Sequence, residues 1–168
     1  MQTNEIPHFD QSVNTTGCCP KFNPDGWGRQ ELHFEDMPFV VARTRSALHI
    51  PLNMGSVFTR VQNHIDAAHA DRPEGFLVLS HDPSAWVGEH LFAVTGDVAG
   101  EEMTKLSGDF ITRVFEGPYR DAEIWLDEMK SLVRANGSEP GRIFFFYTTC
   151  PKCAKAYGQN YIIGIAEI

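Results

Sequence analysis

The chain has 168 residues, and its 14 Lys and Arg against 22 Asp and Glu give a formal net charge of −8. Nucleic-acid binding needs clustered basic side chains, so this balance argues against a nucleic-acid partner. The sequence has no basic amphipathic stretch and no apolar run of about 18 residues, which argues against a membrane partner. Because no signal peptide is recognised either, we expect a cytoplasmic protein whose thiols stay reduced.

The first part of the chain, residues 1–37, predicts an irregular polar arm. Its turn formers include the stretch Asn23-Pro-Asp-Gly26. Phe22 and Trp27 are too apolar for a free tail, so we expect the arm to pack on the body rather than remain disordered.

Residues 38–168 predict one domain made of two similar halves, 38–100 and 104–168. Each half has the order strand, helix, strand, strand, and corresponding elements begin at a nearly constant offset. The expected elements are strand 39–52, helix 56–69, strands 76–80 and 89–95, strand 106–116, helix 121–135, and strands 142–149 and 160–167.

Two such halves favour an α+β fold with pseudo-two-fold symmetry. We expect a curved, mainly antiparallel sheet with both helices on one face. The opposite face would form an apolar cleft, which is a common place for a ligand. The last two strands are expected to form a hairpin with Cys150-Pro-Lys-Cys153 at its tip.

All four cysteines fall in two pairs, Cys18 with Cys19 and Cys150 with Cys153. A Cys-x-x-Cys turn directs two sulfurs to one point, so the sequence predicts a structural zinc site with four thiolate ligands. His8 or His33 could replace one of the adjacent cysteines. Incidental thiols remain an alternative, and so does a redox pair. A thioredoxin-like pair needs a helix that begins at the first cysteine, which we do not predict here.

Candidate catalytic groups occur where strands end. Glu116, before the Gly117-Pro118 turn, could act as general base on water if burial raised its pKa; an exposed turn position is the simpler interpretation. His49 and Asn53 occupy the corresponding place in the first half, where a structural histidine is the alternative. No Ser–His–Asp order or Gly-x-Ser-x-Gly elbow occurs.

Candidate ligand contacts are aromatic or acidic. Trp86 offers a stacking surface and Glu89 a counter-charge for a cation, with core Trp and surface Glu as alternatives. Tyr147 and Tyr161 on the last two strands combine a ring with a phenol, and Tyr119 follows the Gly-Pro turn. Tyr147 is also a catalytic candidate, beside Glu116 and His49.

The second half resembles a known family. A strand ending in Phe115-Glu-Gly-Pro-Tyr119, a helix with Trp125 and a terminal strand pair are similar to the GyrI-like (gyrase-inhibitor-like) small-molecule-binding domains. These share their fold with effector-binding domains of multidrug-responsive activators and with the SOUL haem-binding group. The resemblance covers residues 38–168. It implies a cleft for flat, amphipathic and often cationic molecules, which some members hydrolyse with a cleft carboxylate. In this chain Asn160 and Tyr161 stand where many relatives carry that carboxylate.

The motifs around Cys18, His49 and Tyr147 look like a distinct bacterial branch whose members are labelled hydrolases. We therefore expect a stand-alone protein that binds a small amphipathic or aromatic molecule. A hydrolase acting on a small, xenobiotic-like substrate in the same cleft is the alternative. A third hypothesis is an interaction protein whose cleft or arm binds another polypeptide.

Overall fold

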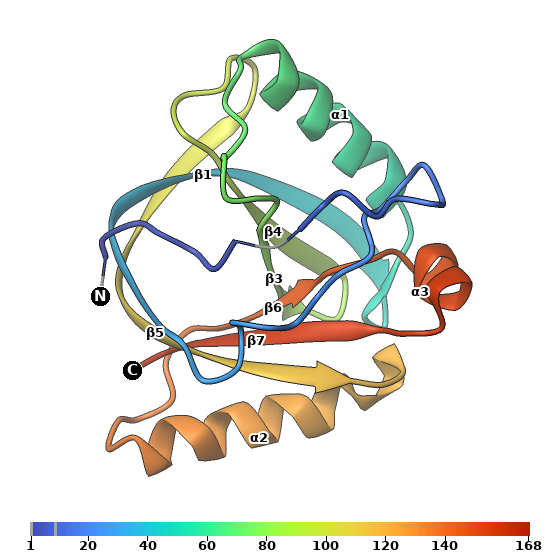
Figure 1. Ribbon diagram of the computed structural model, residues 1–168. Helices are drawn as coiled ribbons and strands as arrows, with labels where there is room; N and C mark the ends of the chain where they lie inside the picture. The colour runs from blue at the N-terminus through green and yellow to red at the C-terminus, as the bar shows by residue number, and fades with distance from the viewer. Residues whose placement is uncertain (1, 9) are drawn as a thin grey trace. The chain divides into compact units, whose positions relative to one another are not determined.

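The computed structural model describes residues 2–8 and 10–168 (Figure 1). The chain divides into a terminal unit, Met1–Phe34 with Gly108–Ile168, and a middle unit, Glu35–Ser107. Strands β1 (Glu31–Ala47) and β5 (Glu102–Glu116) each continue from one unit into the other. The predicted combination of helices with antiparallel strands is confirmed in both units. The two-fold relation between the halves and the cleft stay predictions.

In the middle unit, three antiparallel strands carry one helix. Strand β4 (Val87–Ala93) pairs with β1 on one side and with β3 (Val78–Ser84) on the other. Apolar side chains at a spacing of four make α1 (Met54–Ala67) amphipathic, so it packs on one sheet face. The core under α1 includes Val57, Val61 and Ile65 from the helix and Val40, Val78 and Phe92 from the strands. A short strand, β2 (Ile50–Pro51), pairs with the end of β1.

The terminal unit also has three antiparallel strands with an amphipathic helix packed on them. Strand β7 (Tyr161–Glu167) pairs antiparallel with β5 and with β6 (Ile143–Tyr147). A 3-10 turn, η1 (Tyr119–Asp121), leads into α2 (Ala122–Ala135), which runs along β5 and β7 in Figure 1. The helix buries Trp125, Met129 and Val133, and these pack on Phe115, Phe145, Ile162 and Ala166.

Several strand boundaries differ from the sequence expectation. We expected the irregular arm to reach residue 37 and a strand to cover 39–52, but β1 begins at Glu31 and ends at Ala47. Pro38 is accommodated within β1, and its carbonyl accepts a hydrogen bond from Val94 N at 3.2 Å. The segment 96–103 was expected to be a connection, whereas β5 begins at Glu102.

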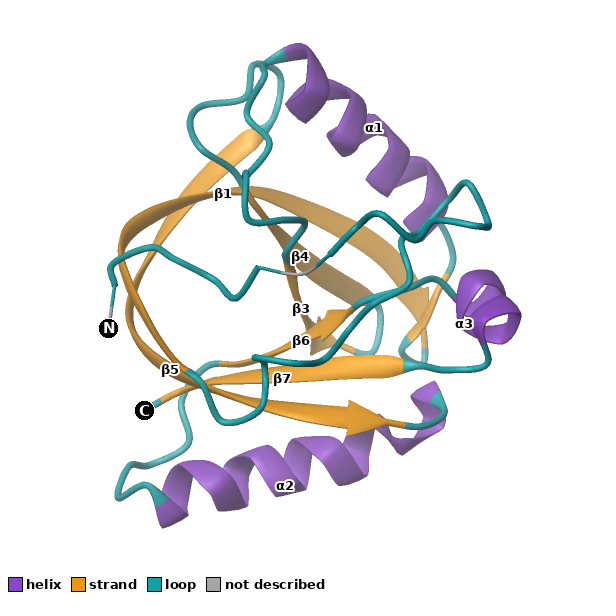
Figure 2. Cartoon of the chain, in the orientation of Figure 1, coloured by secondary structure: helices purple, strands orange, loops and turns teal. Residues whose placement is uncertain are grey.

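The expected hairpin between the last two strands is wrong at its tip. A helix, α3 (Pro151–Tyr157), separates β6 from β7 (Figure 2), although the two strands pair as expected. Cys150 is extended, with φ −70° and ψ 161°, and Pro151 takes the first helical position, where its missing N–H costs nothing. Gly158 ends the helix in the left-handed conformation, with φ 68°.

The arm is anchored by two aromatic residues. Trp27 is fully buried and Phe22 nearly so. Both rings contact Phe146 of β6, with centroids 5.8 and 5.9 Å away respectively. Gln159 Nε2 donates to the Phe22 carbonyl at 2.8 Å. The arm is therefore packed into the terminal unit at Phe22 and Trp27.

Helices α1 and α2 have 14 residues each. No helix in the described part of the chain combines the length and the apolar character that crossing a bilayer requires.

Candidate metal centre and adjoining hollow

The four cysteine sulfurs meet in the terminal unit. Cys18 and Cys19 come from the arm, Cys150 directly precedes α3, and Cys153 lies in its first turn. All four Sγ atoms lie within 4.8 Å of one another. In a tetrahedral zinc site with Zn–S bonds of about 2.3 Å, neighbouring sulfurs are about 3.8 Å apart. The cluster therefore needs only a small contraction to enclose one ion.

Two side chains hold the arm at this place. The Tyr157 hydroxyl, at the end of α3, donates to the Cys19 carbonyl at 2.6 Å. Thr16 Oγ1 lies 3.4 Å from the same hydroxyl and 3.3 Å from Cys153 Sγ. The hydroxyl groups of Tyr157 and Thr16 thus hold the two cysteine pairs close together, in addition to any contact between the thiols.

The thiols differ in burial and in acidity. Cys18 is exposed and Cys153 is buried. The hydrogen bond with Thr16 is the main cause that lowers the pKa of Cys153 from 9.0 to about 7. Burial raises the pKa of Cys19 well above its ordinary value. Metal binding would displace the remaining protons, because zinc takes thiolates as ligands.

Neither histidine proposed as a substitute ligand belongs to this cluster. His33 Nδ1 is 2.7 Å from Asp109 Oδ1, which already engages that ring. The group of potential ligands consists of the four thiols, without His8 or His33. Four thiolates would leave no open position for water, so this donor set suits a structural ion.

The expectation that no helix begins at the first cysteine of the Cys150–Cys153 pair is wrong. We expected no helix at Cys150, yet α3 begins at the next residue. A Cys-Pro-Lys-Cys sequence at a helix start is compatible with thiol–disulfide chemistry. A redox pair, however, uses two sulfurs, whereas four converge here.

An open hollow of about 380 Å³ adjoins the thiol cluster in the same unit. The end of β5 and the turn after it form one side, residues 116–119. The other sides come from α3, through Pro151, Ala154 and Lys155, and from residues 158–160. Helix α3 thus carries Cys153, follows Cys150 directly, and also forms a wall of the hollow.

Two lining residues of the hollow, Gly117 and Asn160, are joined by hydrogen bonds. Gly117 N donates to the Asn160 carbonyl at 3.2 Å, and Asn160 Nδ2 donates to the Gly117 carbonyl at 2.7 Å. Gly117 has φ 153°, and an added Cβ would lie 3.4 Å from the Trp125 ring. Asn160 Oδ1 is buried without a hydrogen-bond partner in the described chain.

Tyr119 connects the hollow with Thr149, the residue before Cys150. Its hydroxyl donates to the Thr149 carbonyl at 2.8 Å. Burial is the main cause that raises the pKa of Tyr119 to about 12. The phenol therefore stays protonated, as a donor must.

Four of the predicted site residues gather around this hollow. Glu116 and Tyr119 line it. Tyr147 lies beside Tyr119, with ring centroids 5.7 Å apart, and Tyr161 stands opposite Glu116 in the β5–β7 pairing. Glu116 is exposed, which agrees with the simpler interpretation of this residue and not with a buried general base.

The other predicted residues lie in the middle unit. His49 Nδ1 is 3.0 Å from Asp82 Oδ2, and Trp86 is 60% exposed in the β3–β4 turn. Asn53 Oδ1 accepts a hydrogen bond from the Arg45 backbone N–H at 2.7 Å.

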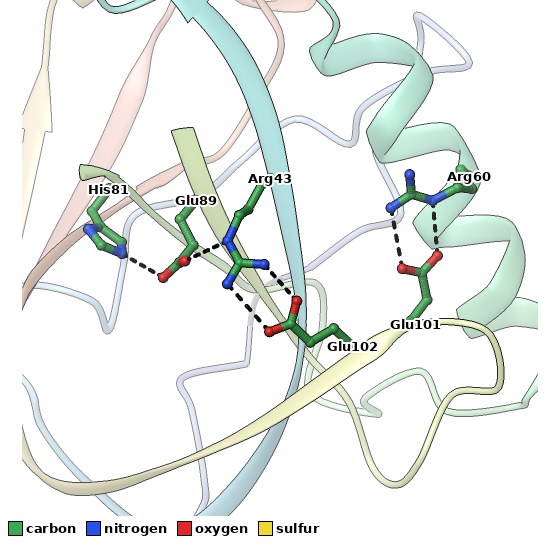
Figure 3. Close-up of polar contacts among 6 residues, drawn as sticks. All are labelled: Arg43, Arg60, His81, Glu89, Glu101 and Glu102. Carbon is green, nitrogen blue, oxygen red and sulfur yellow. Dashed lines mark hydrogen bonds and ion pairs between the residues drawn. The ribbon is translucent and has the colours of Figure 1, made fainter. Parts of the chain in front are cut away.

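Glu89 already has two partners in a row of charged groups across the strands (Figure 3). Its carboxylate lies 3.2 Å from Arg43 Nε and 3.0 Å from His81 Nε2. Arg43 Nη1 also contacts Glu102 at 2.6 Å. A cation approaching Glu89 would therefore compete with Arg43.

The sequence analysis missed a buried polar cluster in the middle unit. His90 is hydrogen-bonded through Nε2 to Thr44 Oγ1 at 2.9 Å and through Nδ1 to Ser80 Oγ at 2.8 Å. Burial lowers the pKa of His90 to about 4. All three residues lie on the α1 side of the adjacent strands β1, β4 and β3, and only the register of these strands brings them together.

Lys155 and Gln159, which line the hollow, were also missed. They stand in a segment expected to be a hairpin, where no helical face was assigned. Recognising Pro151 and Gly158 as helix boundaries would have placed them.

Comparison with known proteins gives a family and one structural likeness. The protein-family profile described as "Bacterial hydrolase" matches residues 9–168. No curated protein matches the sequence. Among solved structures, the chain is similar to the structure of SAV2435 bound to tetraphenylphosphonium, with 12% identity and a TM-score of 0.48. That likeness covers 83% of this chain and 92% of the other.

Proposed function

The chain belongs to the bacterial hydrolase family, and from this premise we propose that it binds a small molecule in the hollow beside a structural zinc centre. The convergence of four thiols within 4.8 Å is the observation that carries the metal part of the proposal. Zinc is favoured because a closed set of four thiolates suits it. A cytoplasmic location, where thiols stay reduced, belongs to the same proposal.

The proposed role of the zinc is to hold the arm against α3. Cys18 and Cys19 would supply two ligands from the arm, and Cys150 and Cys153 two from the start of α3. The described residues of the arm, 2–8 and 10–30, form no helix and no named strand, so a metal would add to the few contacts that hold the arm.

The zinc part is tested by native mass spectrometry on protein purified without chelator. We expect one zinc ion per chain, lost after thiol modification. Four free thiols with no bound metal would contradict it, and a mass lower by two hydrogens would identify a disulfide instead. The same spectra would report any small molecule that co-purifies.

The hollow is the best-supported place for the small molecule. Tyr119, Pro118, Pro151 and Ala154 offer ring and aliphatic surface, while Glu116, Lys155, Gln159 and Asn160 offer charge and hydrogen bonds. Its volume of about 380 Å³ falls within the range of small-ligand sites. Tyr147 and Tyr161 would support the lining residues Tyr119 and Glu116, beside which they lie.

Hydrolysis of that molecule is the second candidate function, favoured by family membership. Water would attack an electrophilic carbonyl carbon while Glu116 accepts its proton. The bond to the leaving heteroatom then breaks, and the leaving group takes the proton. Tyr147 is the further catalytic candidate in this unit. His49, Asn53, Trp86 and Glu89 stay predictions for ligand contacts made by the middle unit.

A pair of substitutions on α3 tests the hollow. Ala154 lines it and is buried, whereas Ala156 is exposed on the same helix and does not line it. We expect Ala154→Leu to abolish binding of a co-purified or screened molecule, and Ala156→Leu to leave it intact. Equal binding by both folded variants would place the ligand elsewhere.

A further inference from the structure

Two opposite charges without partners face the same hollow. Glu116 comes from the end of β5 and Lys155 from α3, and both side chains are exposed. Within the described residues, neither has an ion pair or a hydrogen bond to another side chain. Some other charges of this unit are paired, such as Arg142 with Glu167 at 2.6 Å and Arg113 with Glu128.

Between these charges, the lining is apolar or amide. The Tyr119 ring, Pro118 and Pro151 present surface for an apolar group, while Gln159 supplies amide hydrogen-bonding capacity. The Tyr119 hydroxyl is already used on Thr149, so its ring rather than its phenol is available. A simple cation would satisfy Glu116 but leave Lys155 facing a positive charge.

We propose that the hollow takes an amino-acid-like zwitterion, with its ammonium group at Glu116 and its carboxylate at Lys155. The apolar side chain of the ligand packs on Tyr119. A free α-amino acid and a dipeptide share this chemistry and differ in the separation of the two charges. This assignment rests on the proposed function of the hollow and narrows its ligand from any small molecule to one class.

The test uses four probes that differ in charge. L-phenylalanine carries both charges, 2-phenylethylamine only the ammonium group, 3-phenylpropionate only the carboxylate, and glycyl-phenylalanine both at a greater separation. Binding is followed by the backbone amide NMR signals of Gly117 and Gly158, which border the hollow. We expect one of the two zwitterions to bind most tightly, and which of them does identifies the source.

Matched variants assign each charge. Glu116→Gln should weaken the preferred zwitterion about fivefold, the effect of one exposed ion pair, and leave 3-phenylpropionate unchanged. Lys155→Gln should weaken the zwitterion similarly and leave 2-phenylethylamine unchanged. Lys152→Gln, an exposed lysine of α3 that does not line the hollow, should change nothing.

The outcomes separate the two proposals. If 2-phenylethylamine or 3-phenylpropionate binds as tightly as both zwitterions, the zwitterion assignment is overturned and the hollow remains a binding site. If none of the four probes shifts the Gly117 and Gly158 signals, the zwitterion assignment is overturned, and the hollow itself is decided by the comparison of Ala154→Leu with Ala156→Leu. The zinc centre, measured separately, is unaffected by either result.

Discussion

Cys153 Sγ lies 3.3 Å from Thr16 Oγ1, although 137 positions separate the two residues in the chain. This contact joins the arm to α3 at the point where the four thiols meet. The arm, the thiol cluster and the wall of the hollow therefore share the helix α3, so a change in one should affect the others.

Removing the buried thiol should loosen the arm. We expect Cys153→Ser to lower zinc stoichiometry and to speed amide hydrogen exchange in residues 16–22. The control, Lys152→Ala, changes the neighbouring exposed residue and should alter neither quantity. Unchanged zinc content in the Cys153 variant would show that this sulfur is not a ligand.

The buried His90 predicts an acid-sensitive middle unit. Its folded pKa of about 4 lies below the ordinary 6.5, chiefly through burial, so the unfolded chain binds the extra proton first. The stabilisation is complete above pH 6.5 and is lost as the pH falls toward 4, by roughly 3 kcal/mol in total. Asp82, Glu89 and His81 also act on this ring.

Denaturation curves between pH 7 and 4 test this dependence. We expect His90→Asn to flatten the decline in unfolding free energy on the acid side. His69→Asn, at an exposed position with φ 50°, should keep the wild-type slope. A wild-type slope in the His90 variant would mean that another group titrates.

Gly164 permits the close approach of α2 to β7. A Cβ at this position would lie 2.5 Å from Met129 Sδ and 2.9 Å from the Phe115 ring. Gly164→Ala should therefore lower the unfolding free energy by about 1–3 kcal/mol. Gly55→Ala in α1 meets no atom within 4 Å and should raise it by about 0.4–1 kcal/mol. Thermal denaturation measures the change in unfolding free energy for both variants. Equal changes would contradict the role of Gly164 in the packing of α2 on β7.

Two neighbouring carboxylates in Figure 3 should differ in their importance. The Glu101 side chain is 4% exposed and accepts from Arg60 Nε at 3.1 Å and from His64 Nδ1 at 2.8 Å. Glu102 is 57% exposed and pairs with Arg43. We expect Glu101→Gln to cost about 1–3 kcal/mol, because it weakens charge-assisted bonds to a buried group.

Glu102→Gln is the matched control and should leave the midpoint of thermal denaturation within error, because an exposed pair contributes little. A larger loss at Glu102 than at Glu101 would contradict the role assigned to burial.

Local patterns predicted most elements, because apolar spacing reports a buried face directly. Val57, Val61 and Ile65 marked α1, and Trp125, Met129 and Val133 marked α2. The error at α3 has a local cause: Cys150-Pro-Lys-Cys153 between two strands suggests a turn, and only Gly158 signals that a helix intervenes.

The candidate site was less predictable, because it depends on contacts between distant segments. The convergence of Cys18 and Cys19 with Cys150 and Cys153 was predicted, because a zinc site with four thiolates needs two pairs of cysteines. The place of Lys155 was missed because it depends on the face of α3, and no helix was assigned between Pro151 and Gly158. Likewise His90 gains its partners Thr44 and Ser80 only from the register of β1, β3 and β4.

Zinc K-edge X-ray absorption on protein purified without chelator tests the central claim most directly. The account predicts one zinc ion per chain with four sulfur ligands at about 2.3 Å. A zinc shell containing nitrogen or oxygen, or protein that holds no zinc while its four cysteines stay reduced, would contradict it.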